Sequence, residues 1–161
     1  MKLLKNNFTG EIAKPKTEVE ISFNNDVLSF NFVAHDSSLE SYSDKKNDDL
    51  WRKNVVEVFL DLNDPDFYYE FEVAPNGATF VAKKYKDKLV FINDDFFKSN
   101  VEIVGNSYKV LMKIDLKILG KAENFKFNAF RIEDENLEAL SPTFCDTFHK
   151  REKFISLDLW E

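Results

Sequence analysis

Cysteine, glycine and proline are scarce in this chain, and their scarcity excludes several classes of protein. The single cysteine, Cys145, excludes an intrachain disulfide and a metal cluster built on cysteines. A lone thiol acts as a nucleophile only beside a well-placed base, so we expect Cys145 to be a small buried apolar residue. Four glycines and four prolines in 161 residues are too few for a low-complexity or collagen-like chain.

Positive charge and long apolar runs are also lacking. Lysine and arginine number 22 against 29 acidic residues, which gives a net charge of −7. Because affinity for nucleic acid depends largely on basic side chains, we expect no nucleic-acid partner. The basic stretch at 83–88 is interrupted by Asp87 and is typical of a solvent-exposed hairpin end. No run approaches the roughly 20 apolar residues of a membrane-spanning helix, so we expect no membrane partner.

The N-terminal sequence, MKLLKNNFTGEI, lacks the apolar run of a signal peptide. We therefore expect either a cytoplasmic protein or a secreted form from which the signal has been removed. The length suits one domain over residues 1–161, which can bury a core without disulfides.

Aromatic residues, in contrast, are abundant: phenylalanine occurs 17 times, and two central strand patterns are rich in rings. Side chains alternate along a strand, so each pattern has one apolar face and one mixed face. In residues 55–62 the apolar face holds Val56, Val58, Leu60 and Leu62, and the mixed face holds Val55, Glu57, Phe59 and Asp61. In residues 67–74 the apolar face holds Phe67, Tyr69, Phe71 and Val73, and the mixed face holds Tyr68, Glu70, Glu72 and Ala74. Carboxylates beside rings suggest a polar ligand with some flat apolar surface.

Short strand patterns and turn signals fill most of the remaining chain. Further strands are predicted at 17–24, 27–35, 78–84, 89–92, 101–104, 108–114, 125–133 and 154–160. We also expect long loops at 36–49 and 135–145, an irregular N-terminal segment at 1–16 and one helical turn at 116–119. About nine or more strands with very little helix predict an all-β protein. We expect an antiparallel β-sandwich with jelly-roll or immunoglobulin-like layers.

Several side chains on or near the central strands could contact a ligand. Trp51 follows a polar loop and either caps the core or offers a stacking platform for a sugar ring. Glu57, Glu70 and Glu72 either form surface ion pairs or accept hydrogen bonds from sugar hydroxyls. A pair of carboxylates could also hydrolyse a glycosidic bond, but the sequence does not distinguish a protonated acid from an ionised one. Arg131 needs a partner, either Glu70, Glu72 or a ligand.

Metal and haem sites are weaker hypotheses. The acidic residues of the turn containing Asp61, Asp64 and Asp66 are spaced almost as in the calcium loop of a helix-loop-helix motif. However, the position at which that loop requires glycine is Asp66 here. A looser calcium site at these three aspartates is kept as an alternative. Neither histidine has zinc-ligand spacing, and a histidine with Met112 could in principle ligate haem.

Five sequence blocks in order resemble the family 9-like carbohydrate-binding module over residues 17–159. They are LWRKNVVEVFL, YYEFEVAPNG, FNAFRIE, LSPTF and FHKREKFISLDL. The resemblance implies a β-sandwich related to the DOMON domains, which bind sugars or haem. It places Trp51 at an aromatic clamp, Glu57 at a hydroxyl-binding carboxylate and Phe148 at the second clamp, with Phe144 as the alternative. The family has a basic residue on the second central strand, where this chain has Glu72. Arg131, on another strand, could take the role of that basic residue.

The resemblance implies non-catalytic binding of a small saccharide or a chain end. Such a module would assist carbohydrate catabolism by glycoside hydrolases. We expect a monomer with a saccharide ligand, a glycoside hydrolase as partner and no cofactor, calcium excepted. The alternatives are a haem-binding domain of the DOMON type, with His149 and Met112 as ligands, and a protein-interaction sandwich without a sugar ligand.

Overall fold

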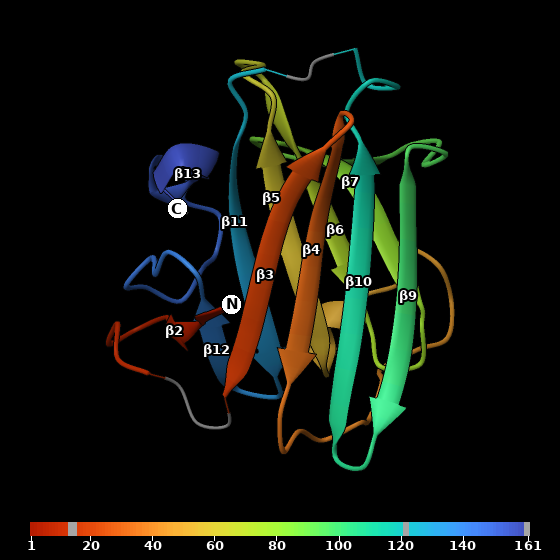
Figure 1. Cartoon of the computed structure of the whole chain (residues 1–161), viewed down its shortest axis with the longest axis vertical. Helices are drawn as coiled ribbons and strands as arrows, with labels where there is room; N and C mark the ends of the chain where they lie inside the picture. Colours follow the sequence, from red (N-terminus) through yellow and green to blue (C-terminus); the bar gives the residue numbers. More distant parts are fainter. Residues whose placement is uncertain (13–15, 121–122, 160–161) are drawn as a thin grey trace.

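Two antiparallel sheets pack face to face in the computed structural model, which describes residues 1–12, 16–120 and 123–159 (Figure 1). The five-stranded sheet has the order β1 (Lys2–Leu3), β3 (Thr17–Asn24), β4 (Val27–Ala34), β10 (Ser107–Asp115) and β9 (Phe97–Val104). The second sheet has the order β2 (Lys5–Asn6), β12 (Asn136–Ala139), β11 (Lys126–Glu133), β5 (Val55–Asp61), β6 (Phe67–Val73), β7 (Thr79–Tyr85) and β8 (Leu89–Phe91), and β13 (Ile155–Ser156) pairs with β11. The predicted antiparallel β-sandwich is confirmed.

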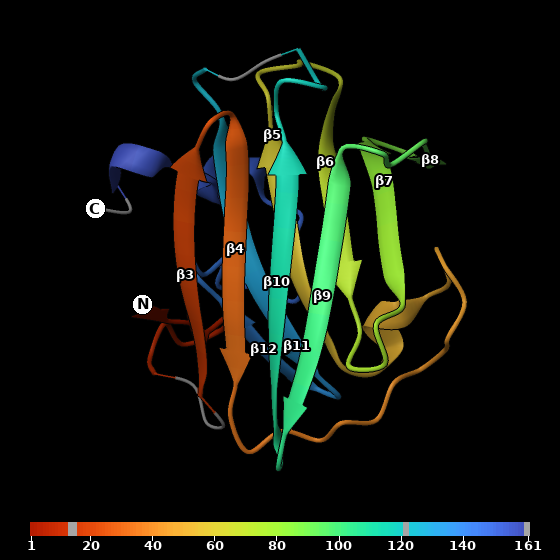
Figure 2. The ribbon, with the colours of Figure 1, turned by 45° about the vertical axis from the view of Figure 1, so that its right-hand side comes forward.

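The main core lies between the sheets and follows the alternation of the strands. Figure 2 shows β3, β4, β10 and β9 in front of the larger sheet. The apolar faces predicted for β5 and β6 point into this core. Rings meet edge-on across it, as between Phe30 of β4 and Phe127 of β11, whose centroids lie 5.4 Å apart. Phe71 of β6 and Phe97 of β9 are 5.0 Å apart. The many phenylalanines thus fill the space between two aligned sheets.

Helix is confined to three short 3-10 segments within the described residues: η1 (Leu50–Arg52), η2 (Arg151–Lys153) and η3 (Leu157–Leu159). None of them approaches the length of a membrane-spanning helix. The turn expected at 116–119 is a hydrogen-bonded turn and does not form a helix.

Four local predictions differ from the structure. Strand β9 begins at Phe97, because its pairing with β10 continues to Ile114. Part of the loop expected at 135–145 is β12, which forms a tight hairpin with β11. The strand expected at 154–160 is only β13 followed by η3, and its last residue lies outside the described residues. The N-terminal segment at 1–16 contributes β1 and β2.

Cys145 also differs from expectation. It is only partly buried, and its Sγ lies 3.4 Å from both the Thr143 hydroxyl and the Thr147 carbonyl.

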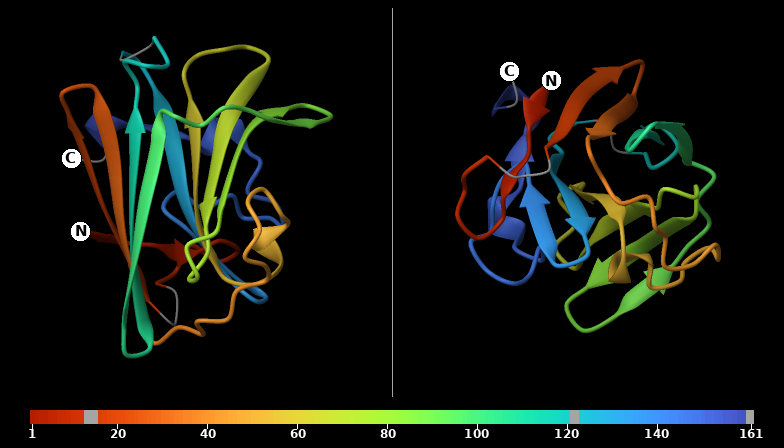
Figure 3. Two further views of the ribbon diagram at one scale, coloured as in Figure 1. Left: turned by 90° about the vertical axis from the view of Figure 1, so that its right-hand side faces the viewer. Right: turned by 90° about the horizontal axis from the view of Figure 1, so that it is seen from below.

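A second apolar cluster covers the outer face of the larger sheet. It includes Val55 and Phe59 of β5, Phe130 of β11, Leu50 of η1 and Phe148 of the C-terminal segment. Figure 3 shows η1 on this side of the sandwich, away from the five-stranded sheet. The outer face is therefore partly covered by two loops, and a pocket lies between them.

The inter-sheet rings predict a large loss of stability when one of them is truncated. Phe71→Ala removes a fully buried ring and leaves a cavity, so the free energy of unfolding should fall by about 3–5 kcal/mol. Urea denaturation measures this difference. Ile118→Ala, at a side chain that is 61% exposed, is the control and should change stability by about 0.5 kcal/mol or less. Equal losses in both variants would contradict this account of the core.

Candidate ligand-binding pocket

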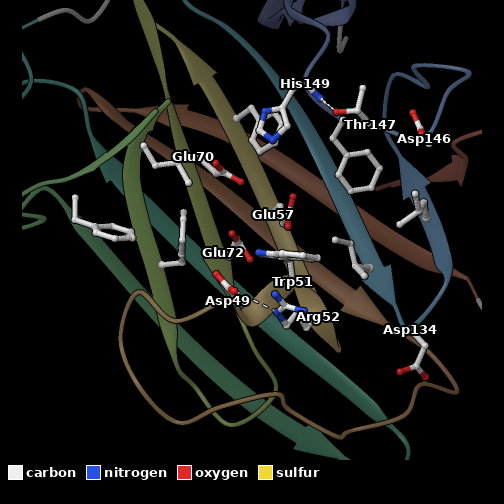
Figure 4. Close-up of a pocket in the computed structure, with 17 residues that line it drawn as sticks. Asp49, Trp51, Arg52, Glu57, Glu70, Glu72, Asp134, Asp146, Thr147 and His149 are labelled. Atoms are coloured by element: carbon white, nitrogen blue, oxygen red, sulfur yellow. Dashed lines mark hydrogen bonds and ion pairs between the residues drawn. The ribbon is translucent and has the colours of Figure 1, made fainter. Parts of the chain in front are cut away.

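The register of the central strands brings three glutamates together on the outer face of the larger sheet. Glu57 of β5 lies directly opposite Glu72 of β6, and Glu70 lies opposite Phe59. Because residues two apart on a strand share a face, all three carboxyl groups point to the same side. One carboxylate oxygen from each of the three lies within 4.8 Å of the others. Figure 4 shows the three side chains converging at the floor of a pocket.

The three glutamates are buried, and their charge is not neutralised by neighbouring side chains of the described chain. Glu57 is 2% exposed, Glu70 6% and Glu72 0%. Both carboxylate oxygens of Glu72 and one of Glu70 have no hydrogen-bond donor among the described residues. No salt bridge within that part of the chain involves them. The surface ion pairs that the sequence suggested for these residues are therefore not formed.

Burial determines how these carboxyl groups titrate. It raises the pKa of both Glu57 and Glu72 well above the ordinary value for glutamate. The charge of Glu70 adds to the rise at both, whereas interaction with Glu72 partly opposes it at Glu57. Burial also raises the pKa of Glu70 to about 7, against an opposing effect of Lys84. A proton shared between Glu57 and Glu72 would relieve part of their repulsion. The floor of the pocket therefore binds protons or another cation more readily than a surface glutamate does.

Trp51 forms one wall of the pocket. Its side chain is 45% exposed, and the Arg52 guanidinium lies 4.9 Å from the ring centroid. Arg52 is held in turn by Asp49, with 3.2 Å between Nε and a carboxylate oxygen. Arg52 thus covers one face of the indole, and in Figure 4 Trp51 lies between Arg52 and the glutamates. The ring is therefore held rigidly enough to stack on a flat ligand surface.

Asn47 fixes the loop that carries Trp51. Its backbone N–H donates to the Thr79 carbonyl at 2.8 Å, and its side-chain oxygen accepts from the Val81 N–H at 2.9 Å. Its φ is 61°, a conformation that asparagine tolerates better than most residues. The loop is thereby attached to the edge of β7, one strand away from Glu70 and Glu72.

The C-terminal segment forms the opposite wall. Phe148 stacks on Phe130, with centroids 4.1 Å apart, and remains only 7% exposed. His149 stacks on Phe59 at 4.8 Å, and its Nδ1 is hydrogen-bonded to the Tyr68 hydroxyl. Burial, together with Lys84, lowers the pKa of His149 to about 4, so its imidazole is neutral at physiological pH. This wall presents neutral rings to the cavity.

The pocket is open to solvent on one side and has a volume of about 560 Å³. Its lining is acidic and aromatic: Asp49, Glu57, Glu70, Glu72, Asp134 and Asp146 supply carboxyl groups, Trp51, Phe59, Phe80, Phe91, Phe148 and His149 supply rings, and Arg52, Leu89, Ile132, Leu137 and Thr147 complete it. This volume suits a small molecule such as one or two sugar rings. Five of the six predicted ligand-binding residues, all except Arg131, line this one cavity.

Arg131 is not part of this pocket. Neighbouring residues of β11 alternate between faces, so Phe130 and Ile132 face outward and Arg131 faces the interior. Its guanidinium lies 5.1 Å from the Tyr108 ring centroid and donates to the hydroxyl of Ser37 and the carbonyl of Ile132. The prediction that Arg131 contacts the ligand here is therefore wrong.

The ion-pair partner of Arg131 also differs from the one predicted. It is Glu133, at 3.3 Å, rather than Glu70 or Glu72.

The turn proposed for calcium is occupied by an arginine. Both carboxylate oxygens of Asp61 accept hydrogen bonds of 2.7 Å from Arg151, which also reaches the Asp64 backbone carbonyl. One Asp64 carboxylate oxygen accepts from the Asp66 backbone N–H. The guanidinium therefore supplies the positive charge that a calcium ion would bring. Within the described residues, the three glutamates form the one acidic cluster with metal-ligand spacing.

The predicted haem ligands lie on opposite sides of the larger sheet. Met112 is fully buried in the core between the sheets, whereas His149 lines the outer pocket. They cannot coordinate one iron. The other histidine, His35, pairs with Glu18 at 2.8 Å on the five-stranded sheet.

Several pocket residues are not identified by sequence reasoning. Asp134 and Asp146 come from loops. Phe80 and Phe91 come from predicted strands, but the sequence does not indicate that their rings face the pocket. His149 was considered only as a haem ligand. The alternation of side chains along β5 places Phe59 on the same face as Glu57. No local sequence pattern indicates which loop residues close the cavity.

Comparisons with known proteins agree on the fold. No protein-family model matches the chain. A candidate carbohydrate-binding protein from Bacteroides uniformis superposes with a TM-score of 0.79 at 17% identity, covering 95% of this chain and 83% of that one. A family 9 carbohydrate-binding module from Caldicellulosiruptor kristjanssonii, solved in complex with glucose, superposes with a TM-score of 0.66 at 14% identity, covering 96% and 81%. The chain therefore has the fold of the family 9 modules, as its sequence blocks implied.

One curated relative also matches. An "Extracellular protein" from Arthroderma benhamiae is 39% identical over 75 residues, which is 44% of this chain. The match spans 34% of the fungal protein.

The buried glutamates predict that the ligand-free protein loses stability as the pH rises. The raised pKa values of Glu57, Glu70 and Glu72 mean that the native state holds protons that the unfolded chain releases above about pH 4.5. Their stabilising effect is complete below that pH and is lost as the pH rises through the native values, about 7 for Glu70. Glu138, with a pKa raised by burial to about 7, adds to this loss. His149 opposes it, because a lowered pKa contributes stability above about pH 6.5 that is lost towards pH 4.

Four glutamates outweigh one histidine, so the melting temperature should fall between about pH 5 and about pH 8. Glu72→Gln should flatten this decline and raise the free energy of unfolding at about pH 8 by about 1–3 kcal/mol. Glu20→Gln, at an exposed position of β3, is the control and should retain the wild-type slope. A slope in Glu72→Gln as steep as in wild type would show that the cluster does not titrate as described.

Proposed function

We propose that this chain binds a small saccharide, or the end of a saccharide chain, in the pocket over Glu57, Glu70 and Glu72. The observation that carries the proposal is the pairing of a half-exposed Trp51 with buried carboxylates that lack donors. A sugar ring offers a face of C–H bonds to the indole and hydroxyl donors to the carboxylates. Each hydroxyl bound would satisfy an acceptor that is otherwise unpaired.

The fold supports the same ligand class. The family 9 module with this fold was solved with glucose, and the volume of the pocket suits a ligand of that size. Phe148 belongs to the wall opposite Trp51, although it is almost covered and stacks on Phe130. We therefore assign sugar stacking mainly to Trp51. Phe148 shapes the cavity and excludes water.

We propose binding rather than hydrolysis. A glycosidase needs two carboxyl groups in different environments, one protonated to act as acid and one ionised to act as nucleophile or base. Here Glu57, Glu70 and Glu72 are all buried, and burial raises the pKa of each of them. They also lie side by side at the floor of the pocket instead of flanking it. Assays on wild-type protein should detect no turnover of aryl glycosides.

We further propose that the chain acts as a monomeric accessory module that keeps substrate near a glycoside hydrolase. The support is the fold, shared with the family 9 module, and the volume of the pocket. Calcium is a proposal only for the glutamate cluster, because Arg151 occupies the turn at Asp61.

Sugar binding should depend on Trp51. Isothermal titration and thermal-shift measurements against glucose and a panel of mono- and oligosaccharides should show binding in the millimolar to micromolar range. Trp51→Ala should weaken it by about tenfold or more, because the stacking surface is lost. Phe144→Ala is the matched control, since this ring is 57% exposed and does not line the pocket. No binding of any saccharide at high concentration, or equal binding by Trp51→Ala and wild type, would refute the proposal.

A further inference from the structure

We propose that the preferred ligand is a cationic saccharide, an amino sugar whose ammonium group is bound by Glu57, Glu70 and Glu72. The inference rests on the proposed function and specifies the ligand class. Three observations support it: the excess of carboxyl over basic groups in the pocket, the spacing of the carboxylate oxygens, and the apolar neighbours of the cluster.

The pocket has far more carboxyl groups than basic groups. Six carboxyl groups line it, and Arg52 is its one arginine or lysine. Arg52 is already bound to Asp49 and stacked on Trp51, so it does not neutralise the glutamates at the floor. Lys84 of β7 is outside the lining and donates to the Tyr85 carbonyl. A neutral sugar would leave the buried glutamates protonated, as their raised pKa values favour, whereas an ammonium group would stabilise their ionised form.

The spacing of the oxygens fits an ammonium group. Charge-assisted N–H···O bonds are about 2.8 Å long, and three of them in tetrahedral directions place their acceptors about 4.6 Å apart. The oxygens of Glu57, Glu70 and Glu72 lie within 4.8 Å of one another. Glu72 is fully buried and neither of its oxygens has a donor, so the acceptors are free and aimed into the cavity. One ammonium group could therefore bond to all three side chains.

The surroundings favour an organic cation over a metal ion. The cross-strand neighbours of the glutamates on this face are Phe130 beside Glu57, Phe80 beside Glu72, and Phe59 beside Glu70. Calcium prefers six to eight oxygen ligands, and these rings supply none. Rings do attract ammonium groups through their negative faces. An ammonium group needs only three acceptors, and one oxygen from each glutamate provides them.

The test compares ligands that differ only in the substituent at C2 of each sugar ring. Affinities of D-glucosamine, D-glucose and N-acetyl-D-glucosamine, and of chitosan disaccharide and its di-N-acetylated form, are measured by isothermal titration at about pH 7, once with EDTA and once with calcium. Each amino form should bind about tenfold or more tightly than its neutral counterparts, with or without EDTA. Acetylation is the decisive comparison, because it keeps the nitrogen and removes its charge.

Variants locate the effect. Glu72→Gln should reduce the ratio between amino and neutral sugars to about threefold or less, because it removes one charge from the cluster. Asp66→Asn removes the same charge from a turn outside the pocket and should keep the wild-type ratio. Equal or weaker binding of every amino sugar would overturn the inference, as would sugar binding that requires calcium and disappears with EDTA. Neutral-sugar binding that still depends on Trp51 would then leave the proposed function standing, and the absence of all sugar binding would refute both.

Discussion

Two buried glutamates facing each other across neighbouring strands are the constraint on which this structure depends. Like charges directly opposite in a sheet are destabilising, and buried carboxylates without donors are more so. Nothing in the described chain neutralises Glu57 and Glu72, although lysines and an arginine are close in sequence. A sheet needing only stability would carry apolar or complementary residues at these positions. The cost therefore points to a ligand that supplies the missing donors or charge.

The rest of the pocket keeps this arrangement rigid and partly dry. The floor belongs to central strands whose other faces form the main core, so it cannot shift without disturbing the sandwich. The walls come from two loops distant in sequence, one carrying Trp51 and one carrying Phe148. Selectivity can thus be changed through the walls while the charge of the floor stays fixed by the register. This division of roles is common where binding loops sit on a rigid sheet.

Sequence periodicity predicted the floor well and the walls poorly. Alternation in residues 55–62 and 67–74 placed all three glutamates on the mixed faces, and pairing of adjacent strands then had to bring them close. The same alternation, applied to β11, would have put Arg131 inside the sandwich with Phe127 and Ala129. The charge of Arg131 suggested a polar partner on the outer face, whereas its position in the alternation places it in the interior. His149 and Asp146 could not be placed, because loop position depends on contacts such as the Phe59–His149 stack, which no local pattern encodes.

The attachment of Asn47 to β7 has a further consequence, for self-association. Strand β8 pairs with β7 only from Ala82 to Lys84, so the edge at Thr79–Val81 would otherwise present free backbone groups. Unpaired strand edges are templates on which other chains add. Asn47 hydrogen-bonds two of these backbone groups, and its loop covers the edge on which another strand would pair. The segment that positions Trp51 thus also shields a strand edge from other chains, so a change that frees the loop would expose this edge as well.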